Sequence, residues 1–296
     1  LHKVTHSNSP LALVTTRHPS PQGYGRIFRD EQGHFTHIVE DKDLPFNQKF
    51  SLHEVNAGVY SFSVELLKTL TIEKALSCPE WYLTAIWAPE SPFIKHTQIF
   101  FEPDYRIVQG INTWTDYELA EQYYYQLQRE SLVRQGALLK NCRQISVQKA
   151  FRCQPGVQIT GPCILKGALD LGEGAEIEAY SYIESTYTEN QVKIGPFSKV
   201  TENTYLKAQS IVGSFVEVKR SILGESTKAK HLSYIADATI GRFCNIGAFV
   251  VTCNYDGRKK NITTVGDYVF IGSTSQLIAP ITIASCSYIG AGTTLT

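Results

Sequence analysis

His231 is the only histidine after residue 96 in this chain of 296 residues. A neutral imidazole near pH 7 accepts a proton from an attacking amine. Lys219, Lys228 and Lys230 are close to it in sequence, and their charges, if also close in space, would disfavour imidazolium and keep such a base neutral. The alternative is an ordinary buried or surface imidazole, which is the commoner case for a histidine considered alone.

Aliphatic residues recur at every sixth position in three runs. Neither the helical period of 3.6 nor the strand period of two requires this spacing. Hexapeptide repeats are typical of a parallel β-helix, in which equivalent positions of successive hexads all face inward because six is even. A solenoid without chemistry is the alternative. The runs are Ile159, Leu165, Leu171, Ile177 and Ile183; Ile194, Val200, Leu206, Val212 and Val218; and Val265, Ile271, Leu277, Ile283, Ile289 and Leu295.

The hexad pattern is interrupted at residues 247–264, "GAFVVTCNYDGRKKNITT". An insertion in a solenoid projects from one face as a loop, and such loops often carry binding residues. We therefore expect part of a binding site there.

The pattern before residue 150 differs from the hexads. It predicts a hairpin over 25–41 with its turn at Gly33, strands within 51–62 and 96–103, and a helix over 64–77. A longer helix over 114–139 should start at Thr115 or Asp116 as N-cap and end near Gly136. We expect an α/β domain at 1–114, a linker helix and connection at 115–150, and a β-helix at 151–296.

Composition excludes several functional classes. Lys plus Arg and Asp plus Glu both number 28, so the net charge of zero argues against a nucleic-acid partner. No run of about 18 apolar residues is present, so we expect no membrane span. Seven cysteines, odd in number and without a CxxC pair, predict reduced thiols in the cytoplasm. The chain starts at Leu1 and has no Met, from which we expect a truncated N-terminus.

Ten segments, in the same order, resemble one family of bacterial bifunctional enzymes, the N-acetylglucosamine-1-phosphate uridyltransferase/glucosamine-1-phosphate acetyltransferases (GlmU). The resemblance implies a partial, Rossmann-like nucleotidyltransferase domain followed by a left-handed parallel β-helix. The segments are "GYGRI" (23–27), "IVEDKD" (38–43), "EVNAGVYSF" (54–62), "GIN" (110–112), "IGPF" (194–197), "FVEVKRSILG" (215–224), "TKAKHLSYIADATIG" (227–241), "NIGA" (245–248), "TCNYDG" (252–257) and "GDYVFIGSTSQLIAPITI" (266–283).

The resemblance implies that His231 is the general base of acetyl transfer, with Glu217 close by. Glucosamine 1-phosphate would be held by Lys219, Tyr234, Asn245 and Lys260. Acetyl-CoA would be held by Ala248, Asn254, Tyr255, Ser273 and Ala291. The resemblance also implies a homotrimer with sites between subunits.

Three residues depart from the family pattern. Thr201 stands where the family has an Arg, which removes a guanidinium able to grip a phosphate; Lys199, on the same strand, is a possible substitute. Phe249 replaces a Gly along the expected acetyl-CoA path, and Lys230 replaces the Gly before the histidine. We expect activity with weakened sugar-phosphate binding.

For the N-terminal half, the resemblance implies that Gly25, Glu40 and Asn56 contact UDP-N-acetylglucosamine. Asn112 would contact it too and would help an upstream Asp to hold Mg²⁺. The nucleotide loop, catalytic Lys and metal-binding Asp would lie before Leu1, and Ala85 stands where the family has Asp. We expect uridylyl transfer from UTP only in a longer protein.

Two other functions stay open. One is a hexapeptide acyltransferase for another amino sugar, which "CNYDG" argues against. The other is a non-catalytic regulatory subunit, because pyrophosphorylase-like domains joined to β-helices also occur in assembly factors.

Overall fold

The computed structural model describes residues 9–73, 83–89 and 91–296. It divides into two compact units, Leu1–Glu121 and Gln122–Thr296, and each is described separately below. Among the described residues, no helix is both long and apolar enough to cross a membrane.

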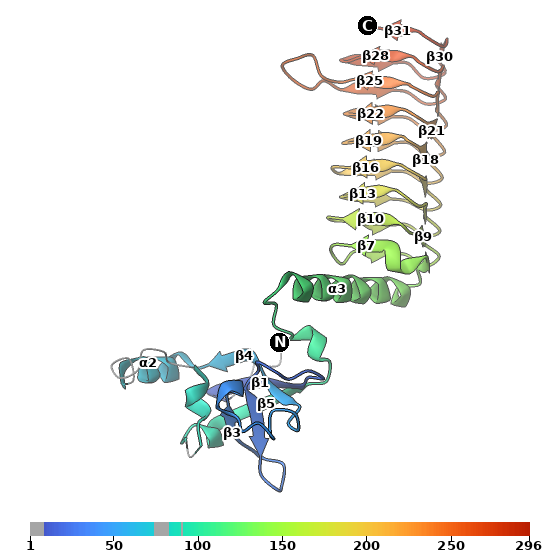
Figure 1. Cartoon of the computed structure of the whole chain (residues 1–296). Helices are drawn as coiled ribbons and strands as arrows, with labels where there is room; N and C mark the ends of the chain where they lie inside the picture. The colour runs from blue at the N-terminus through green and yellow to red at the C-terminus, as the bar shows by residue number, and fades with distance from the viewer. Residues whose placement is uncertain (1–8, 74–82, 90) are drawn as a thin grey trace. The chain divides into compact units, whose positions relative to one another are not determined.

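The first unit contains a five-stranded mixed sheet in the order β3-β2-β4-β1-β5, in which β1 pairs with β5 in parallel and the other pairs are antiparallel (Figure 1). The predicted hairpin, both predicted strands and the start of the predicted helix are confirmed, while residues 74–77 lie outside the described residues. The elements are β1 Leu11–Arg17, β2 Arg26–Arg29, β3 Phe35–Val39, η1 Asp41–Asp43, β4 Glu54–Phe62, α2 Val64–Glu73, η2 Leu83–Trp87, η3 Ile94–His96, β5 Thr97–Glu102 and η4 Tyr105–Ile107.

The long helix α3 spans Trp114–Arg134, so the predicted N-cap at Thr115 or Asp116 is wrong. Thr113 caps it instead: its hydroxyl accepts the N–H of Asp116 at 3.1 Å, and the Asp116 carboxylate accepts the N–H of Thr113 at 2.9 Å. Two side chains three residues apart thus satisfy each other's backbone donors. The predicted end is confirmed, because Gly136 has a φ of +94°, which favours glycine.

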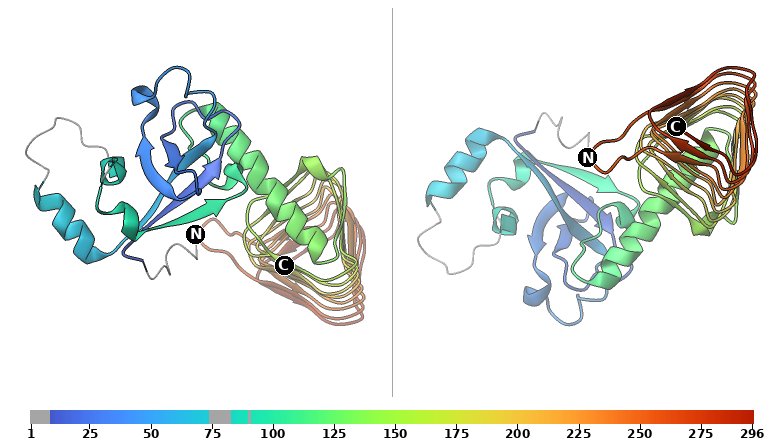
Figure 2. Two further views of the ribbon diagram at one scale, coloured as in Figure 1. Left: turned by 90° about the horizontal axis from the view of Figure 1, so that it is seen from below. Right: turned by 90° about the horizontal axis from the view of Figure 1, so that it is seen from above.

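The second unit is a left-handed parallel β-helix whose coils form three sheets. We name them face 1, face 2 and face 3 in chain order, with corner 1–2, corner 2–3 and corner 3–1 between them. In Figure 1 the face 2 strands lie one above another, and Figure 2 shows the coils superimposed in a triangular outline. The stack includes strands before residue 151, and the three-part division at 114 and 150 stays a prediction.

Every strand of each face pairs in parallel with its neighbours one coil away. Face 1 comprises β6 Leu138–Lys140, β9 Gln158–Thr160, β12 Glu176–Ile177, β15 Lys193–Ile194, β18 Ile211–Ser214, β21 Lys228–His231, β24 Asn245–Ile246, β27 Phe270–Ile271 and β30 Tyr288–Ile289. Face 2 follows the short helix η5 Cys142–Gln144 and comprises β7 Ile145–Val147, β10 Cys163–Lys166, β13 Tyr182–Glu184, β16 Lys199–Thr201, β19 Glu217–Lys219, β22 Tyr234–Ala236, β25 Val251–Cys253, β28 Gln276–Ile278 and β31 Thr294–Leu295. Face 3 comprises β8 Arg152–Cys153, β11 Asp170–Leu171, β14 Thr186–Thr188, β17 Thr204–Leu206, β20 Ile222–Leu223, β23 Ala238–Ile240, β26 Thr263–Val265 and β29 Ile281–Ile283.

The predicted hexad residues fill the interior of the β-helix. All are buried except Leu295, which packs against the same core from the last coil. Burying an aliphatic side chain stabilises the fold by about 1.5–3 kcal/mol, so the column holds the coils together. The interruption is narrower than 247–264: Val251–Cys253 and Thr263–Val265 are strands, and only the segment between them leaves the stack.

Candidate active site

Polar side chains form a column on the outside of face 2. Lys199, Glu217 and Tyr234 share one register position on β16, β19 and β22. The next residue on each strand is buried, so these three point outward, because successive side chains alternate across a strand. The Nζ of Lys199 lies 3.0 Å from Oε1 of Glu217. Two predicted residues, Glu217 and Tyr234, therefore lie on adjacent coils.

His231 is the last residue of β21 and is exposed. Corner 1–2 follows it, and Tyr234 opens the next strand. Lys228 and Lys230 lie on the same strand as His231 and are also exposed, whereas Lys219 ends β19 at corner 2–3. The imidazole therefore lies at corner 1–2, which is the edge of face 2 where the strands that begin with Glu217 and Tyr234 start.

Corner 2–3 holds a cluster of paired charges. The Nζ of Lys219 lies 2.6 Å from Oε1 of Glu202, and this hydrogen bond raises the pKa of Lys219. Arg220 pairs with the other oxygen of Glu202 and donates to both carboxylate oxygens of Asp237 at 2.6 and 2.9 Å. Thr201 is in register with Lys219 but only 3% exposed, and its hydroxyl oxygen has no hydrogen-bond partner among the described residues. It therefore offers nothing that replaces an arginine.

The inserted loop starts at the same corner. The Asn254 amide is buried and donates to Oδ2 of Asp237 at 2.5 Å. Tyr255 and Lys260 face each other across an antiparallel bridge and are both exposed. Arg220 contributes most to lowering the pKa of Asp237, and Asn254 and Lys260 also contribute. The predicted residues Asn254, Tyr255 and Lys260 therefore converge with Lys219 at corner 2–3.

The remaining predicted acetyl-CoA residues lie at corner 1–2. Ala248, Ser273 and Ala291 occupy successive coils there, because the N–H of Thr274 donates to the carbonyl of Ala248 at 2.7 Å and that of Gly292 to the carbonyl of Ser273 at 2.8 Å. These are small side chains, two of them exposed and Ala248 half-buried. They form a strip of accessible backbone on the coils that follow His231.

Two predicted residues have surroundings that the sequence did not indicate. Asn245 is on face 1, in register with Lys228 and Phe270, and thus on a different sheet from Glu217. Phe249 follows Ala248 at corner 1–2, with a φ of +59° and 53% of its surface exposed.

Within one chain the predicted residues of the β-helix therefore fall into two groups. The corner 1–2 group contains His231, Ala248, Ser273 and Ala291, and the corner 2–3 group contains Lys219, Asn254, Tyr255 and Lys260. Glu217 and Tyr234 lie on face 2 between them, and Asn245 lies on face 1. One chain does not bring the two groups into one cleft.

In the first unit three predicted residues do come together. A Cβ at Gly25 would lie 3.1 Å from Cγ2 of Ile38, which is a tight contact, and 3.5 Å from Oε2 of Glu40, so Gly25 and Glu40 are direct neighbours. The N–H of Asn56 donates to the carbonyl of Gly25 at 2.9 Å, and its amide donates to the Tyr60 hydroxyl at 2.6 Å. The Glu40 carboxylate accepts a hydrogen bond from Thr84.

Asn112 lies next to the start of α3. Its amide nitrogen would be 3.6 Å from a Cβ at Gly110, whose N–H donates to the hydroxyl of Tyr24. The nearby Asp116 carboxylate already accepts two backbone N–H groups. No group of three or more His, Cys, Asp or Glu side chains that could hold a metal ion occurs in the described part of the chain.

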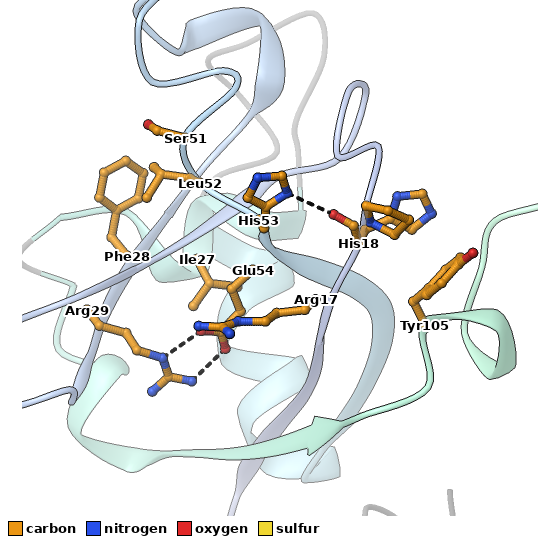
Figure 3. A pocket seen from close by; sticks show the side chains of 11 residues that line it. Arg17, His18, Ile27, Phe28, Arg29, Ser51, Leu52, His53, Glu54 and Tyr105 are labelled. Carbon is orange, nitrogen blue, oxygen red and sulfur yellow. Dashed lines mark hydrogen bonds and ion pairs between the residues drawn. The ribbon is translucent and has the colours of Figure 1, made fainter.

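A separate pocket of about 750 Å³ in the first unit contains none of the predicted residues (Figure 3). Arg29 donates to both carboxylate oxygens of Glu54 there, at 2.6 and 2.8 Å. Glu54 is the first residue of β4 and precedes the predicted Asn56 by two residues, so the pocket lies at the start of that strand.

Sequence reasoning missed Glu202, Arg220 and Asp237. All three have left-handed backbone, with φ of +58°, +48° and +51°. Their only signal in the sequence is a charged residue immediately after a face 2 strand in three successive coils. Recognising it requires knowing where each coil turns.

No family model matches the chain. Among curated proteins, the Bifunctional protein GlmU of Marinobacter nauticus is 36% identical over 305 residues, which cover 97% of this chain and 67% of that protein. The one from Blochmanniella pennsylvanica is 36% identical over 317 residues, covering 99% and 68%. Among solved structures, the acetyltransferase domain of PglB from Neisseria gonorrhoeae in complex with acetyl coenzyme A is 14% identical, covers 67% of this chain and 70% of that one, and has a TM-score of 0.24, too low to carry an argument.

The two GlmU proteins match nearly the whole of this chain, and the matched residues include both units. Such identity over two thirds of each relative is enough to establish common descent of both units together. The chain belongs to the family of bifunctional GlmU proteins.

Proposed function

We propose that the β-helix transfers the acetyl group of acetyl-CoA to the amine of glucosamine 1-phosphate. The observation that carries this proposal is the exposed His231 at the edge of face 2, with Glu217 and Tyr234 on the neighbouring strands and the strip of small residues on the following coils. GlmU relatives support an enzyme rather than a bare scaffold.

His231 acts as the general base in this proposal. The amine nitrogen attacks the thioester carbonyl, the imidazole accepts the proton that the nitrogen loses, and the carbon–sulfur bond breaks to release CoA as the thiol after protonation. Glu217 is in register with Tyr234 on the adjacent strand of face 2, and its carboxylate would orient the acceptor or stabilise the charge on the imidazole.

The other residues bind the two substrates. Lys219, Tyr234, Asn245 and Lys260 would hold glucosamine 1-phosphate through charged and neutral hydrogen bonds. Ala248, Asn254, Tyr255, Ser273 and Ala291 would hold acetyl-CoA, with the small side chains letting its pantetheine arm approach the backbone.

The protein would work as a homotrimer. A cyclic assembly with corner 1–2 of one copy against corner 2–3 of the next would join the two groups of residues that one chain keeps apart. An exposed apolar ridge along corner 1–2 supports this contact: Tyr180, Phe197 and Phe215 stack at 4.7 and 5.1 Å and are 60%, 45% and 59% exposed.

Uridylyl transfer from UTP to give UDP-N-acetylglucosamine is proposed only for the complete protein. Gly25, Glu40 and Asn56 would contact the N-acetylglucosamine portion. Asn112 would be one Mg²⁺ ligand, and carboxylates outside the described residues would have to supply the others. Cytoplasmic location is proposed because the six described cysteines are free thiols.

A subunit that is non-catalytic or acts on another substrate is the second candidate. The buried Thr201 and the Glu202–Lys219 pair favour it, because together they leave little free positive charge for a phosphate.

The test is acetyl transfer by the purified chain. With acetyl-CoA and glucosamine 1-phosphate, thiol release should depend on both substrates and yield N-acetylglucosamine 1-phosphate by mass spectrometry. Thiol release that does not depend on an amino sugar would refute the proposal and favour the second candidate.

A further inference from the structure

Glu202 pairs with both cations of the charge cluster at corner 2–3. One carboxylate oxygen lies 2.6 Å from Lys219, and the other pairs with Arg220. Both hydrogen bonds lower the pKa of Glu202, so the carboxylate is held in its charged form. Lys219 is the residue proposed to grip the phosphate, and it already has an anionic partner.

The charges of the four residues Glu202, Lys219, Arg220 and Asp237 cancel, and Lys260 on the inserted loop is a further cation near Asp237. Lys219 and Arg220 are cationic, Glu202 and Asp237 are anionic, and each cation contacts at least one of these carboxylates. A phosphate needs cations whose hydrogen bonds are free, and it is repelled by a fixed carboxylate at the same place.

The backbone directs the Glu202 side chain towards Lys219 and buries the side chain of the preceding residue, Thr201. Thr201 is 3% exposed, whereas Glu202 turns into the left-handed region and lines a cleft of about 360 Å³ together with Arg220 and Asp237. The residue that replaces the family's arginine is therefore hidden, and the residue after it brings a negative charge to the surface.

We infer that Glu202 is a specificity-determining residue whose carboxylate occupies the anion position beside Lys219 and lowers the affinity of the site for a phosphate-bearing amino sugar. The inference rests on the proposed role of Lys219 in phosphate binding. Glu202 lowers the affinity only for the phosphate group. The affinity for an amino sugar with a free anomeric hydroxyl is not affected.

Isothermal titration calorimetry of the full chain tests this inference. Glucosamine 1-phosphate and glucosamine are each titrated into the wild type, Glu202→Gln and the control Glu184→Gln. Glu184 pairs with Lys166 at 3.6 Å on the same face, in an earlier coil. Removing the carboxylate should lower the Kd of glucosamine 1-phosphate by about tenfold or more, the range of one charged hydrogen bond.

The Kd of glucosamine should change less than about twofold, and Glu184→Gln should behave as the wild type. If Glu202→Gln has a lower melting temperature than the wild type, Glu202→Asp is tested in its place. This variant keeps the charge but has a shorter side chain, and it should also lower the Kd of glucosamine 1-phosphate. The inference is overturned by an unchanged or higher Kd for glucosamine 1-phosphate, by no binding at all to Glu202→Gln, or by equal tightening for both acceptors.

Acetyl transfer measured in the same samples separates this inference from the proposed function. Tighter phosphate binding without any acetyl transfer would refute the proposed reaction and leave the role of Glu202 intact. Acetyl transfer by the chain, together with a Kd for glucosamine 1-phosphate that Glu202→Gln does not lower, would support the proposed reaction and refute the role of Glu202.

Discussion

The ammonium of Lys199 lies 3.0 Å from the carboxylate of Glu217, one coil away on face 2. Lys199 and the buried Thr201 belong to the same strand, so an exposed cation two residues from Thr201 already pairs with a predicted active-site residue. The Lys199 side chain is 53% exposed, against 25% for Lys219, so the ammonium donors that Glu217 does not use remain open to a substrate phosphate.

Replacing Lys199 by Ala should raise the KM for glucosamine 1-phosphate several-fold and change kcat little, because a binding charge is lost and the base is not. The free energy of unfolding should change by less than about 1 kcal/mol, as for exposed ion pairs. Lys193→Ala is the matched control, since Lys193 pairs with Glu176 at 3.1 Å with similar exposure on face 1. Equal KM values for both variants would exclude a role for Lys199.

Replacing His231 by Ala should lower kcat for acetyl transfer by about 10²–10⁴-fold, the usual contribution of a general base. The exposed position of His231 means that the melting temperature should stay near that of the wild type. Steady-state thiol release measures the rate, and His34→Ala, at an exposed turn of the first unit, is the control. An unchanged rate would remove His231 from the mechanism.

Asp237 is expected to position Asn254 without touching a substrate. Asp237→Asn should free the Asn254 amide, raise the KM for acetyl-CoA and lower the free energy of unfolding by about 1–3 kcal/mol, because three donors on Arg220 and Asn254 lose a charged acceptor. Asp267→Asn, which breaks the exposed pair with Arg242, should cost less than about 1 kcal/mol and leave KM unchanged. Urea unfolding measures the change in stability, and steady-state kinetics measures the KM for acetyl-CoA. If the KM of Asp237→Asn equals that of the wild type, Asp237 does not position Asn254 for acetyl-CoA binding.

Asp256 should make the inserted loop sensitive to acid. Its carboxylate accepts the N–H groups of Lys259 and Arg258 and the amide of Asn261, and these bonds lower its pKa to about 2. Because the folded pKa is below the unfolded value of about 3.9, the stabilisation is complete above that value and is lost as the pH falls towards 2.

Asp256→Asn should therefore be less stable than the wild type at pH 6, and the difference should shrink as the pH falls through about 2. Urea unfolding curves between pH 2 and 6 measure this. A difference that does not depend on pH would show that the charge of Asp256 is not responsible.

Local patterns predicted the interior of the β-helix because it depends on spacing alone. Residues such as Val218 and Leu277 are buried as the hexads require. The breaks between runs also have a physical cause: Ile177 pairs with Ile194, so this coil is one residue short of three hexads and the register is reset.

The pairing at the corners could not be predicted from local pattern. Glu202 contacts Lys219 across a whole coil, and this contact depends on the left-handed backbone of Glu202 and on the exact length of the coil between them. The N-cap was misplaced for a smaller reason, because Thr113 and Asp116 form a reciprocal cap that begins the helix earlier. His231 and Asn254 are separated because they lie at opposite ends of the face 2 strands, at corner 1–2 and corner 2–3.

That separation gives the most direct test of the proposed shared site. His231→Ala and Asn254→Ala would each be inactive alone, since each removes one group of the site. If neighbouring copies join corner 1–2 to corner 2–3, subunits of the two variants that are unfolded and reassembled together in equal amounts should regain about a quarter of wild-type acetyl transfer, the share of sites with both groups intact. Activity that stays at the level of the separate variants would contradict a site shared between copies.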